Sequence, residues 1–388
     1  MVPSIPSLPT LDWNTFSGNK TPGTPCLLSQ PDVHLTTSGR ASILLALEML
    51  GIGAGDQVLV PTYHCPTMIA PVVVRKAQPL FYPLDEHGAP RLDWLTQLDT
   101  RSVRAILVAH FFGLPQHLAP IRRWCDQHGI QLIEDCAHAL FGAVDGRPIG
   151  TWGDLAIGSL TKFLPVPEGG CLIRNITSAP LPELVAPGQT RQLKSAFDIL
   201  HTSANHRRLK GFGGLIRGFH TFAGCFKAKD KPSSTSAASA QAIGPSDFDI
   251  RQSHVGLTYA SLWIARNAPQ QRIVASRRRN FQLFARTLGN VRGMKPLCVE
   301  LPDDCAPYVF PLWVDQPDPG YAELRRLGFP VSRWDRLWPT VSRIDNDFGV
   351  RWSSHILQLA CHQDLTQAEL ERMVATLKRV YPSNPAQP

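Results

Sequence analysis

Hydrophobic and polar residues alternate with two different periods along the first half of the chain, and these periods predict strands and helices in turn. Short apolar runs, typical of buried strands, lie at residues 57–61, 79–82, 105–109, 131–134, 155–158 and 170–174. Apolar residues at helical spacing lie between them, at residues 36–50, 67–76 and 118–128. This alternation predicts an α/β fold whose central sheet is mostly parallel and covered by helices on both faces.

The rest of the chain divides into an arm, a biased insertion and a smaller α+β part. We predict an N-terminal arm over residues 1–35 and a large ligand-binding domain over residues 36–255. Residues 227–246 are rich in Ser, Ala and Lys, which is typical of a low-complexity insertion within that domain. A long helix over residues 257–288 opens the predicted small C-terminal domain, residues 256–388.

Composition narrows the class of protein. The 388 residues are 43% hydrophobic and 18% charged, as in a globular protein with a large core, and no apolar run reaches the roughly 18 residues of a membrane span. Nine scattered cysteines, with no CxxC pair or His/Cys cluster, predict reduced thiols, a cytoplasmic protein and no metal site. The formal charge of +8 is dispersed, and its densest run, Arg277–Arg279, is interpreted as a solvated helix face. We therefore expect neither nucleic-acid binding nor membrane binding.

Two residues with the chemistry of a cofactor site follow predicted strands, at the sheet edge where ligands bind in such folds. Asp135 follows the strand at 131–134, and Lys162 lies in a Pro/Gly-rich turn after the strand at 155–158. An amine near a fixed carboxylate suits pyridoxal 5'-phosphate (PLP), because the lysine forms a Schiff base and the carboxylate keeps the pyridine nitrogen protonated. Asp135 could instead cap the next helix, and Lys162 could be a solvated surface charge.

Further candidates surround this pair. A helix start carries bare amides that favour a phosphate, here at Ser38, Gly39 and Arg40. The hydroxyl of Ser159 could reach the same phosphate or cap local backbone. His138 could bond the phenolic oxygen of the cofactor, pack on its ring or be a structural histidine. Three residues after the first strand could cover a bound ring or pack in the core: Tyr63, His64 and Cys65.

Taken together, these motifs resemble the DegT/DnrJ/EryC1/StrS family of PLP-dependent aminotransferases of fold type I, from about Ser38 to Asn175. The resemblance is carried by residues 38–41, 51–61, 110–113, 133–138, 150–154, 161–162 and 168–170. It implies that Lys162 forms the Schiff base, that Asp135 pairs with the pyridine nitrogen and that His138 replaces the usual glutamine near the phenolic oxygen. It also implies phosphate contacts from the amides of Gly39 and Arg40, and a homodimer with active sites at the subunit interface.

Three departures from the family pattern concern the substrate more than the cofactor. The usual Ser-Phe-x-Pro-Thr-Lys run is here 158–162, so the phosphate-binding serine has moved or is replaced. The usual aromatic stacking position is Cys65, which leaves stacking to other residues, namely Tyr63, His64 or His138. The Asn-Tyr-Arg-Met-Ser motif has its nearest counterpart in residues 249–253.

The leading hypothesis is a transferase that moves an amino group from an amino acid, with glutamate as the expected donor, to a small keto substrate such as a keto-sugar nucleotide. Lys162 would act as general base and acid. Two alternatives stay open at this point. One is a PLP-dependent lyase, decarboxylase or condensing enzyme, and the other is a non-catalytic regulatory relative.

Overall fold

The computed structural model describes residues 4–18, 23–176, 180–209 and 249–382. The predicted low-complexity insertion at 227–246 lies outside these described residues. Among the described helices none combines the length and the apolar character that crossing a membrane requires.

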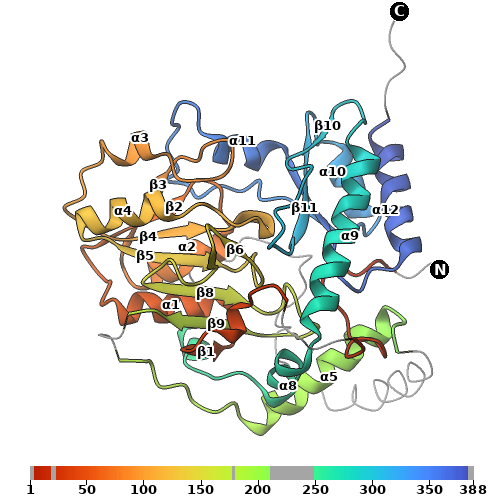
Figure 1. The fold of residues 1–388 in the computed structure, drawn as a ribbon, viewed down its shortest axis with the longest axis horizontal. Coiled ribbons are helices and arrows are strands. Elements are labelled where there is room, and N and C mark those ends of the chain that lie inside the picture. The colour runs from red at the N-terminus through yellow and green to blue at the C-terminus, as the bar shows by residue number, and fades with distance from the viewer. Residues whose placement is uncertain (1–3, 19–22, 177–179, 210–248, 383–388) are drawn as a thin grey trace, which may run out of the picture.

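A seven-stranded sheet forms the centre of the large domain (Figure 1). Its strand order is β1-β9-β8-β5-β4-β2-β3. The strands are β1 (Val33–Thr36), β2 (Gln57–Pro61), β3 (Gln78–Tyr82), β4 (Val103–Ala109), β5 (Gln131–Cys136), β8 (Leu155–Ser159) and β9 (Gly170–Arg174). The pairs among β2, β3, β4, β5 and β8 are parallel, while β9 pairs antiparallel with both β1 and β8. The prediction of a mostly parallel sheet is confirmed, and β1 is a strand that the sequence pattern missed.

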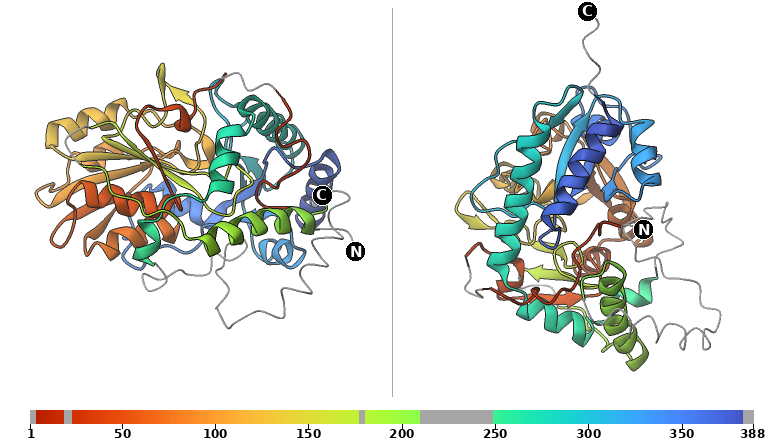
Figure 2. Two further views of the ribbon diagram at one scale, coloured as in Figure 1. Left: turned by 90° about the horizontal axis from the view of Figure 1, so that it is seen from below. Right: turned by 90° about the vertical axis from the view of Figure 1, so that its right-hand side faces the viewer.

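Helices cover both faces of this sheet, as predicted. Seen from below in Figure 2, α4 (Ala119–His128) lies on one face, and α1 (Gly39–Met49) and α2 (Pro66–Val74) lie on the other. Smaller elements connect them: η1 (Leu27–Ser29), α3 (Leu92–Leu95), η2 (Phe111–Gly113) and the hairpin of β6 (Ala143–Val144) and β7 (Arg147–Pro148). Helix α1 begins where the Ser38 side chain accepts a hydrogen bond of 3.2 Å from the amide of Ala41.

The predicted long helix over 257–288 is two helices, α8 (Tyr259–Asn267) and α9 (Gln270–Leu288). The break falls at Pro269, which has no amide proton and disfavours helical dihedrals at the preceding Ala268. Before α8, the chain forms α5 (Gln189–Asn205) and α7 (Ile250–Ser253).

The small domain is an antiparallel sheet covered by helices. Its strand order is β10-β11-β13-β12. The strands are β10 (Met294–Pro296), β11 (Val309–Val314), β12 (Val331–Ser332) and β13 (Ile356–Ala360), and the helices are α10 (Gly320–Arg326), α11 (Phe348–His355) and α12 (Gln367–Val380). Figure 1 places α9 and α12 side by side at this end of the molecule.

Helix α9 lies between the two domains and buries one of the arginines that the sequence pattern placed in solvent. Arg277 is fully buried, Arg278 is half-buried and Arg279 is exposed. The interpretation of this triplet as a solvated face is therefore wrong for Arg277, because its position lies on the packed side of the helix with Phe281 and Phe284.

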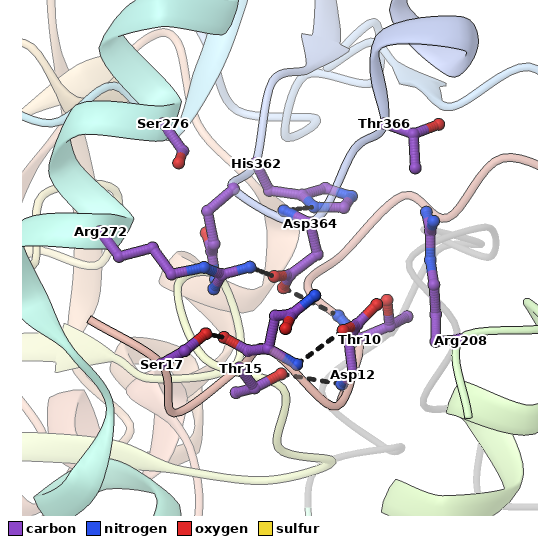
Figure 3. A network of polar contacts seen from close by, with 12 residues as sticks. Thr10, Asp12, Thr15, Ser17, Arg208, Arg272, Ser276, His362, Asp364 and Thr366 are labelled. Atoms are coloured by element: carbon purple, nitrogen blue, oxygen red, sulfur yellow. Dashed lines mark hydrogen bonds and ion pairs between the residues drawn. The ribbon is translucent and has the colours of Figure 1, made fainter. Parts of the chain in front are cut away.

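The N-terminal arm is fastened to α9 and to the loop after β13 (Figure 3). The amide of Thr10 donates to Asp364 at 3.3 Å, and Arg272 pairs with the same carboxylate at 2.9 Å. His362 donates through Nε2 to the backbone carbonyl of Pro6 at 3.0 Å. Residues 6–10 of the arm are thus bound to the C-terminal part of the chain.

The turn at η2 lets the small domain approach the large one closely. Phe112 and Gly113 both have left-handed backbones, with φ of 62° and 88°. A Cβ on Gly113 would lie 2.5 Å from the amide nitrogen of Tyr308 and 2.6 Å from the carbonyl oxygen of Ala306. Only glycine therefore lets the segment before β11 pass here, and the amide of Tyr308 donates to the carbonyl of Phe112 at 2.8 Å.

Candidate active site

A cavity of about 230 Å³ opens at the carboxyl ends of the parallel strands. Its wall includes all but two of the residues predicted from the sequence, namely Ser38, Gly39, Arg40, Cys65, Asp135, His138, Ser159 and Lys162. The other two, Tyr63 and His64, lie elsewhere. The rule that ligands bind at the carboxyl ends of parallel strands therefore selected residues that are far apart in the sequence and lie on one cavity.

Asp135 is the penultimate residue of β5. Only one of its two carboxylate oxygens accepts a hydrogen bond from a described residue. Its Oδ1 accepts a hydrogen bond of 2.7 Å from the amide of Ala137, and no described residue donates to Oδ2. This is a turn contact two residues on, so the alternative that Asp135 caps a helix does not hold. Burial raises the pKa of Asp135, while the Ala137 amide and the charge of Lys162 partly oppose the rise.

Lys162 follows β8 and lies on the same cavity. Burial lowers the pKa of its amine, and the Asp135 carboxylate opposes this shift. Lys162 is partly buried and lines the cavity, so the alternative of a fully solvated surface lysine does not hold. Within the described ranges the two side chains form no direct ion pair. The Nζ atom lies 5.3 Å from the ring centroid of Tyr308, in cation–π range.

His138 is held as a neutral ring. Burial, followed by the charge of Lys162, lowers its pKa well below the ordinary value. Its Nδ1 accepts a hydrogen bond of 3.2 Å from the amide of Phe112. A neutral imidazole that accepts at Nδ1 carries its proton on Nε2, so Nε2 is a hydrogen-bond donor. Its ring packs on Tyr308 and Trp334, with centroids 4.6 and 5.0 Å away.

The start of α1 forms the opposite end of the cavity. A Cβ on Gly170 would lie 2.4 Å from the carbonyl carbon of Ser38, so the bare glycine allows α1 to start directly on β9. Arg40 lines the cavity, and its guanidinium has no hydrogen bond or ion pair to any described residue. The hydroxyls of Ser159 and Thr161 lie 3.3 Å apart beside this helix start. Free amides, hydroxyls and one unpaired cation together suit an anion.

Tyr63 and His64 are not on the cavity wall, and their polar atoms bond within the protein. Tyr63 is fully buried among aromatic rings, and its hydroxyl accepts a hydrogen bond of 3.0 Å from Gln358. His64 donates through Nδ1 to the carbonyl of Pro61 and accepts at Nε2 from the amide of Trp338. Burial lowers the pKa of His64 to about 4. The core-packing alternative therefore holds for both residues, and only Cys65 of this run reaches the cavity.

Two aromatic residues of the small domain were missed by the sequence reasoning. Trp334 lies on the cavity wall between Tyr63 and His138, with ring centroids 5.0 Å from each. Tyr308 faces Lys162 and His138. Trp334 and Trp338 lie close together in the sequence, but nothing in their spacing connects them to the strand ends.

A buried network of hydrogen bonds supports β5 just before Asp135. Glu134 is fully buried and accepts from four donors: the amides of Gly150, Trp152 and Gly153 at 2.6, 2.9 and 3.1 Å and His110 Nε2 at 2.9 Å. Asp154 accepts from the amide of Leu132 at 2.6 Å and from Arg122 at 2.9 Å. Both carboxylates order the 150–154 turn, and this fixes the strand that carries Asp135.

Comparison with protein families identifies the region that forms this site. A family model described as the DegT/DnrJ/EryC1/StrS aminotransferase family matches residues 29–178. This span contains β1 through β9 and every cavity residue predicted from the sequence.

Curated relatives match the same part of the chain. GDP-perosamine synthase of Vibrio cholerae is 33% identical over 147 residues, which are 37% of this chain and 40% of that protein. L-glutamine:2-deoxy-scyllo-inosose aminotransferase of Streptomyces kanamyceticus is 36% identical over 140 residues, which are 35% of this chain and 33% of that protein. The match thus covers two fifths or less of the length of these relatives.

Solved structures extend the likeness to both domains. Helicobacter pylori PseC, an aminotransferase involved in the biosynthesis of pseudoaminic acid, has a TM-score of 0.63 at 14% identity and covers 98% of both chains. The aminotransferase from Psychrobacter cryohalolentis has a TM-score of 0.61 at 18% identity, covering 90% of this chain and 87% of that one. These likenesses establish the fold, and the prediction of fold type I with a smaller C-terminal domain is confirmed.

Proposed function

We propose that the protein is a PLP-dependent aminotransferase, because a model of the DegT/DnrJ/EryC1/StrS aminotransferase family matches residues 29–178. The observation that carries this proposal is the placement of Lys162 and Asp135 on one cavity without a direct ion pair. A partly buried amine and a buried carboxylate that leave space between them suit a flat group that contacts both.

The residues of the cavity fit PLP at each of its polar positions. The free Oδ2 of Asp135 would accept from the pyridine nitrogen, and Nε2 of His138 would donate to the phenolic oxygen. The start of α1, with Gly39 and Arg40, would hold the phosphate. When bound, PLP supplies an electron sink for the carbanion formed at the substrate's α-carbon.

Each side chain then has a separate task in amino transfer. Lys162 takes and returns the proton at the substrate's α-carbon, and its burial-lowered pKa makes the neutral amine more available for this. Asp135 holds a proton on the ring nitrogen. The neutral His138 keeps a donor in place without adding a second positive charge beside Lys162.

The acceptor that we propose is a keto sugar, and the donor is glutamate. The acceptor is supported by relatives whose names describe a perosamine synthase and inosose aminotransferases. Those inosose enzymes carry L-glutamine in their names, so glutamine is the second donor to test. The guanidinium of Arg40, which has no partner among the described residues, would compensate the charge of an anionic group in the cavity.

We also propose a homodimer in the cytoplasm. The large exposed apolar side chains of α5 and α8 support a second copy as their cover, since Leu193, Tyr259 and Trp263 are 73%, 74% and 55% exposed. All cysteines in the described ranges are free, which supports a reducing compartment. Light scattering of the purified chain tests the first point, and fluorescent tagging in cells tests the second.

One experiment tests the proposed reaction. The purified chain is loaded with PLP, reduced with borohydride and mapped by mass spectrometry, and we expect the label on Lys162. Glutamate should convert the unreduced protein to its amino form, which is seen as loss of the visible absorbance, and a keto sugar should restore it. Lys162→Ala should lose both signals, whereas Lys378→Ala, at an exposed position of α12, should keep them.

Two results would contradict the proposal. A label on any other lysine, or no bound PLP, would remove Lys162 from its role. Binding of PLP at Lys162 with no conversion by any amino donor would instead favour elimination, decarboxylation or condensation chemistry.

A further inference from the structure

Two backbone carbonyls at the active-site lysine are held by side chains from distant parts of the chain. The carbonyl of Lys162 accepts a hydrogen bond of 2.7 Å from Nη2 of Arg277, 115 residues away. The carbonyl of Phe163 accepts one of 2.8 Å from Nε2 of Gln363, 200 residues away. Arg277 also donates through Nε to Oε1 of Gln363 at 2.9 Å, which closes the contacts into a ring.

The local backbone offers these carbonyls no other donor. The amides of Phe163 and Leu164 both turn back to the carbonyl of Leu160, at 3.0 and 2.8 Å. Within the described ranges, no backbone amide reaches the carbonyl of Lys162 or that of Phe163. Since a buried carbonyl without a partner is costly, the two side chains decide how the turn that carries Lys162 is held.

Arg277 makes these contacts with a buried, charged side chain. Its guanidinium is fully buried, bonds only to neutral oxygens among the described residues and lies 4.4 Å from the ring centroid of Phe163. Burial lowers the pKa of Arg277 to about 10. Helix packing alone does not require a buried charge, because an apolar side chain would pack there without the desolvation cost. The planar fork of donors is what a lysine or an apolar residue cannot supply.

The same guanidinium also fixes the aromatic wall that faces the lysine. Its Nη1 donates to the carbonyls of Pro307 and Tyr308, at 3.0 and 3.1 Å. The ring of Tyr308 lies 5.3 Å from Nζ of Lys162. The side chain of Arg277 therefore holds the backbone of Lys162 and the backbone of Tyr308 at the same time.

We propose that Arg277 and Gln363 are positioning residues that fix the turn at Lys162 and so determine where its Nζ lies in the cavity. This inference rests on the proposed function, because it assigns the position of Nζ a role in reaching the cofactor. Neither side chain lines the cavity. Their effect passes through the backbone of Lys162 and Phe163.

The reactivity of the Lys162 amine depends on where its Nζ lies in the cavity. Four titratable groups face it from the elements packed around it: Asp135 in β5, His138 after β5, Cys65 before α2 and Tyr308 before β11. An amine released from its partly buried position in the cavity is better solvated, so we expect its pKa to rise towards the ordinary value. The pH dependence of the rate at which apoprotein captures PLP measures this pKa, because only the neutral amine reacts.

The test compares substitutions of two buried side-chain amides, those of Gln363 and Asn280. Gln363→Leu removes both bonds of Gln363 in the ring of contacts. Asn280→Leu removes a buried amide that donates to the carbonyls of Cys361 and His362, one turn along α9, and touches neither Lys162 nor Phe163. We expect Gln363→Leu to raise the apparent pKa by about one unit and to slow capture at neutral pH about tenfold. Asn280→Leu should lose thermal stability to a similar degree and keep the wild-type pKa.

The apparent pKa of these variants distinguishes a positioning role from a purely structural one. A pKa that stays at the wild-type value in Gln363→Leu, with only the thermal midpoint lowered, would reduce the contact to a structural role and overturn the inference. If Gln363→Leu does not fold, Gln363→Glu keeps an acceptor for Arg277, lacks the donor to Phe163 and is judged by the same measurement. Wild-type protein that captures no PLP would contradict the proposed function itself.

Discussion

Arg277 and Lys162 are joined by a hydrogen bond of 2.7 Å from a guanidinium to a backbone carbonyl, although one lies on α9 and the other follows β8. The backbone of Lys162, the proposed active-site lysine, is thus held by the helix that links the two domains. Catalytic groups on turns need such support, because a turn alone leaves its backbone free to move.

Replacement of Asp135 by Asn should separate activity from stability. We expect turnover to fall at least about 100-fold, since Asn cannot hold a charged ring nitrogen by ionic pairing, while PLP remains bound through its phosphate. Burial raises the pKa of Asp135, so its ionised form costs stability at every pH above that pKa. The apoprotein of Asp135→Asn should therefore melt at a higher temperature at pH 7 than the wild type. Stopped-flow kinetics and calorimetry measure the two effects, and a variant with near wild-type turnover would exclude the assigned role.

Arg40→Met should weaken cofactor binding without unfolding the protein. The guanidinium lines the cavity and has no partner among the described residues, so its loss removes a charge-assisted bond to the phosphate. We expect the Kd for PLP to rise about tenfold, which corresponds to about 1.4 kcal/mol. Arg104→Met, at a side chain 63% exposed, is the matched control. Equal Kd values for the two variants, measured by fluorescence titration, would show that Arg40 does not contact the phosphate.

Glu134→Gln should destabilise the fold at neutral pH and flatten its response to acid. Burial opposes ionisation of Glu134, but the bonds from His110 and from the 150–154 amides prevail and hold its pKa below the ordinary 4.5. A lowered folded-state pKa contributes stability that is present above 4.5 and is lost as the pH falls through the folded-state value. Replacement by an amide leaves donors unpaired and should cost about 3 kcal/mol at pH 7. Urea unfolding at pH 7 and pH 4 checks this, and the difference between variant and wild type should shrink at the lower pH.

Gly113→Ala should be far more damaging than Gly129→Ala. Both glycines have a left-handed backbone, with φ of 88° and 65°, so each alanine pays about 1–2 kcal/mol of backbone strain. Only at Gly113 would the new Cβ also meet backbone atoms, at 2.5 and 2.6 Å, whereas Gly129 has open space. We expect a loss of about 3 kcal/mol or more for Gly113→Ala, because overpacking adds to the strain. Similar free energies of unfolding for the two variants would contradict the close approach of the domains at this turn.

The strands and the proposed cofactor lysine were accessible to sequence reasoning because their signals are local. Apolar runs located β2, β3, β4, β5, β8 and β9 to within two residues at either end. The rule that ligands bind at strand ends then selected Asp135 and Lys162, which the structure places on one cavity. The strand β1 was missed because its burial is incomplete and its apolar signal is correspondingly weak.

The amino-acid sequence alone determined the type of sheet, the order of its elements and the residues that line the cavity at the carboxyl ends of its strands, because periodicity and turn chemistry act over a few neighbouring residues. Tertiary structure decided that Tyr63 and His64 turn into the core and that Trp334 reaches the cavity. It also buried Arg277 behind Lys162, which no local pattern indicates. These contacts join residues more than a hundred positions apart, and only the packing of α9 and the small domain against the sheet brings their atoms within bonding distance.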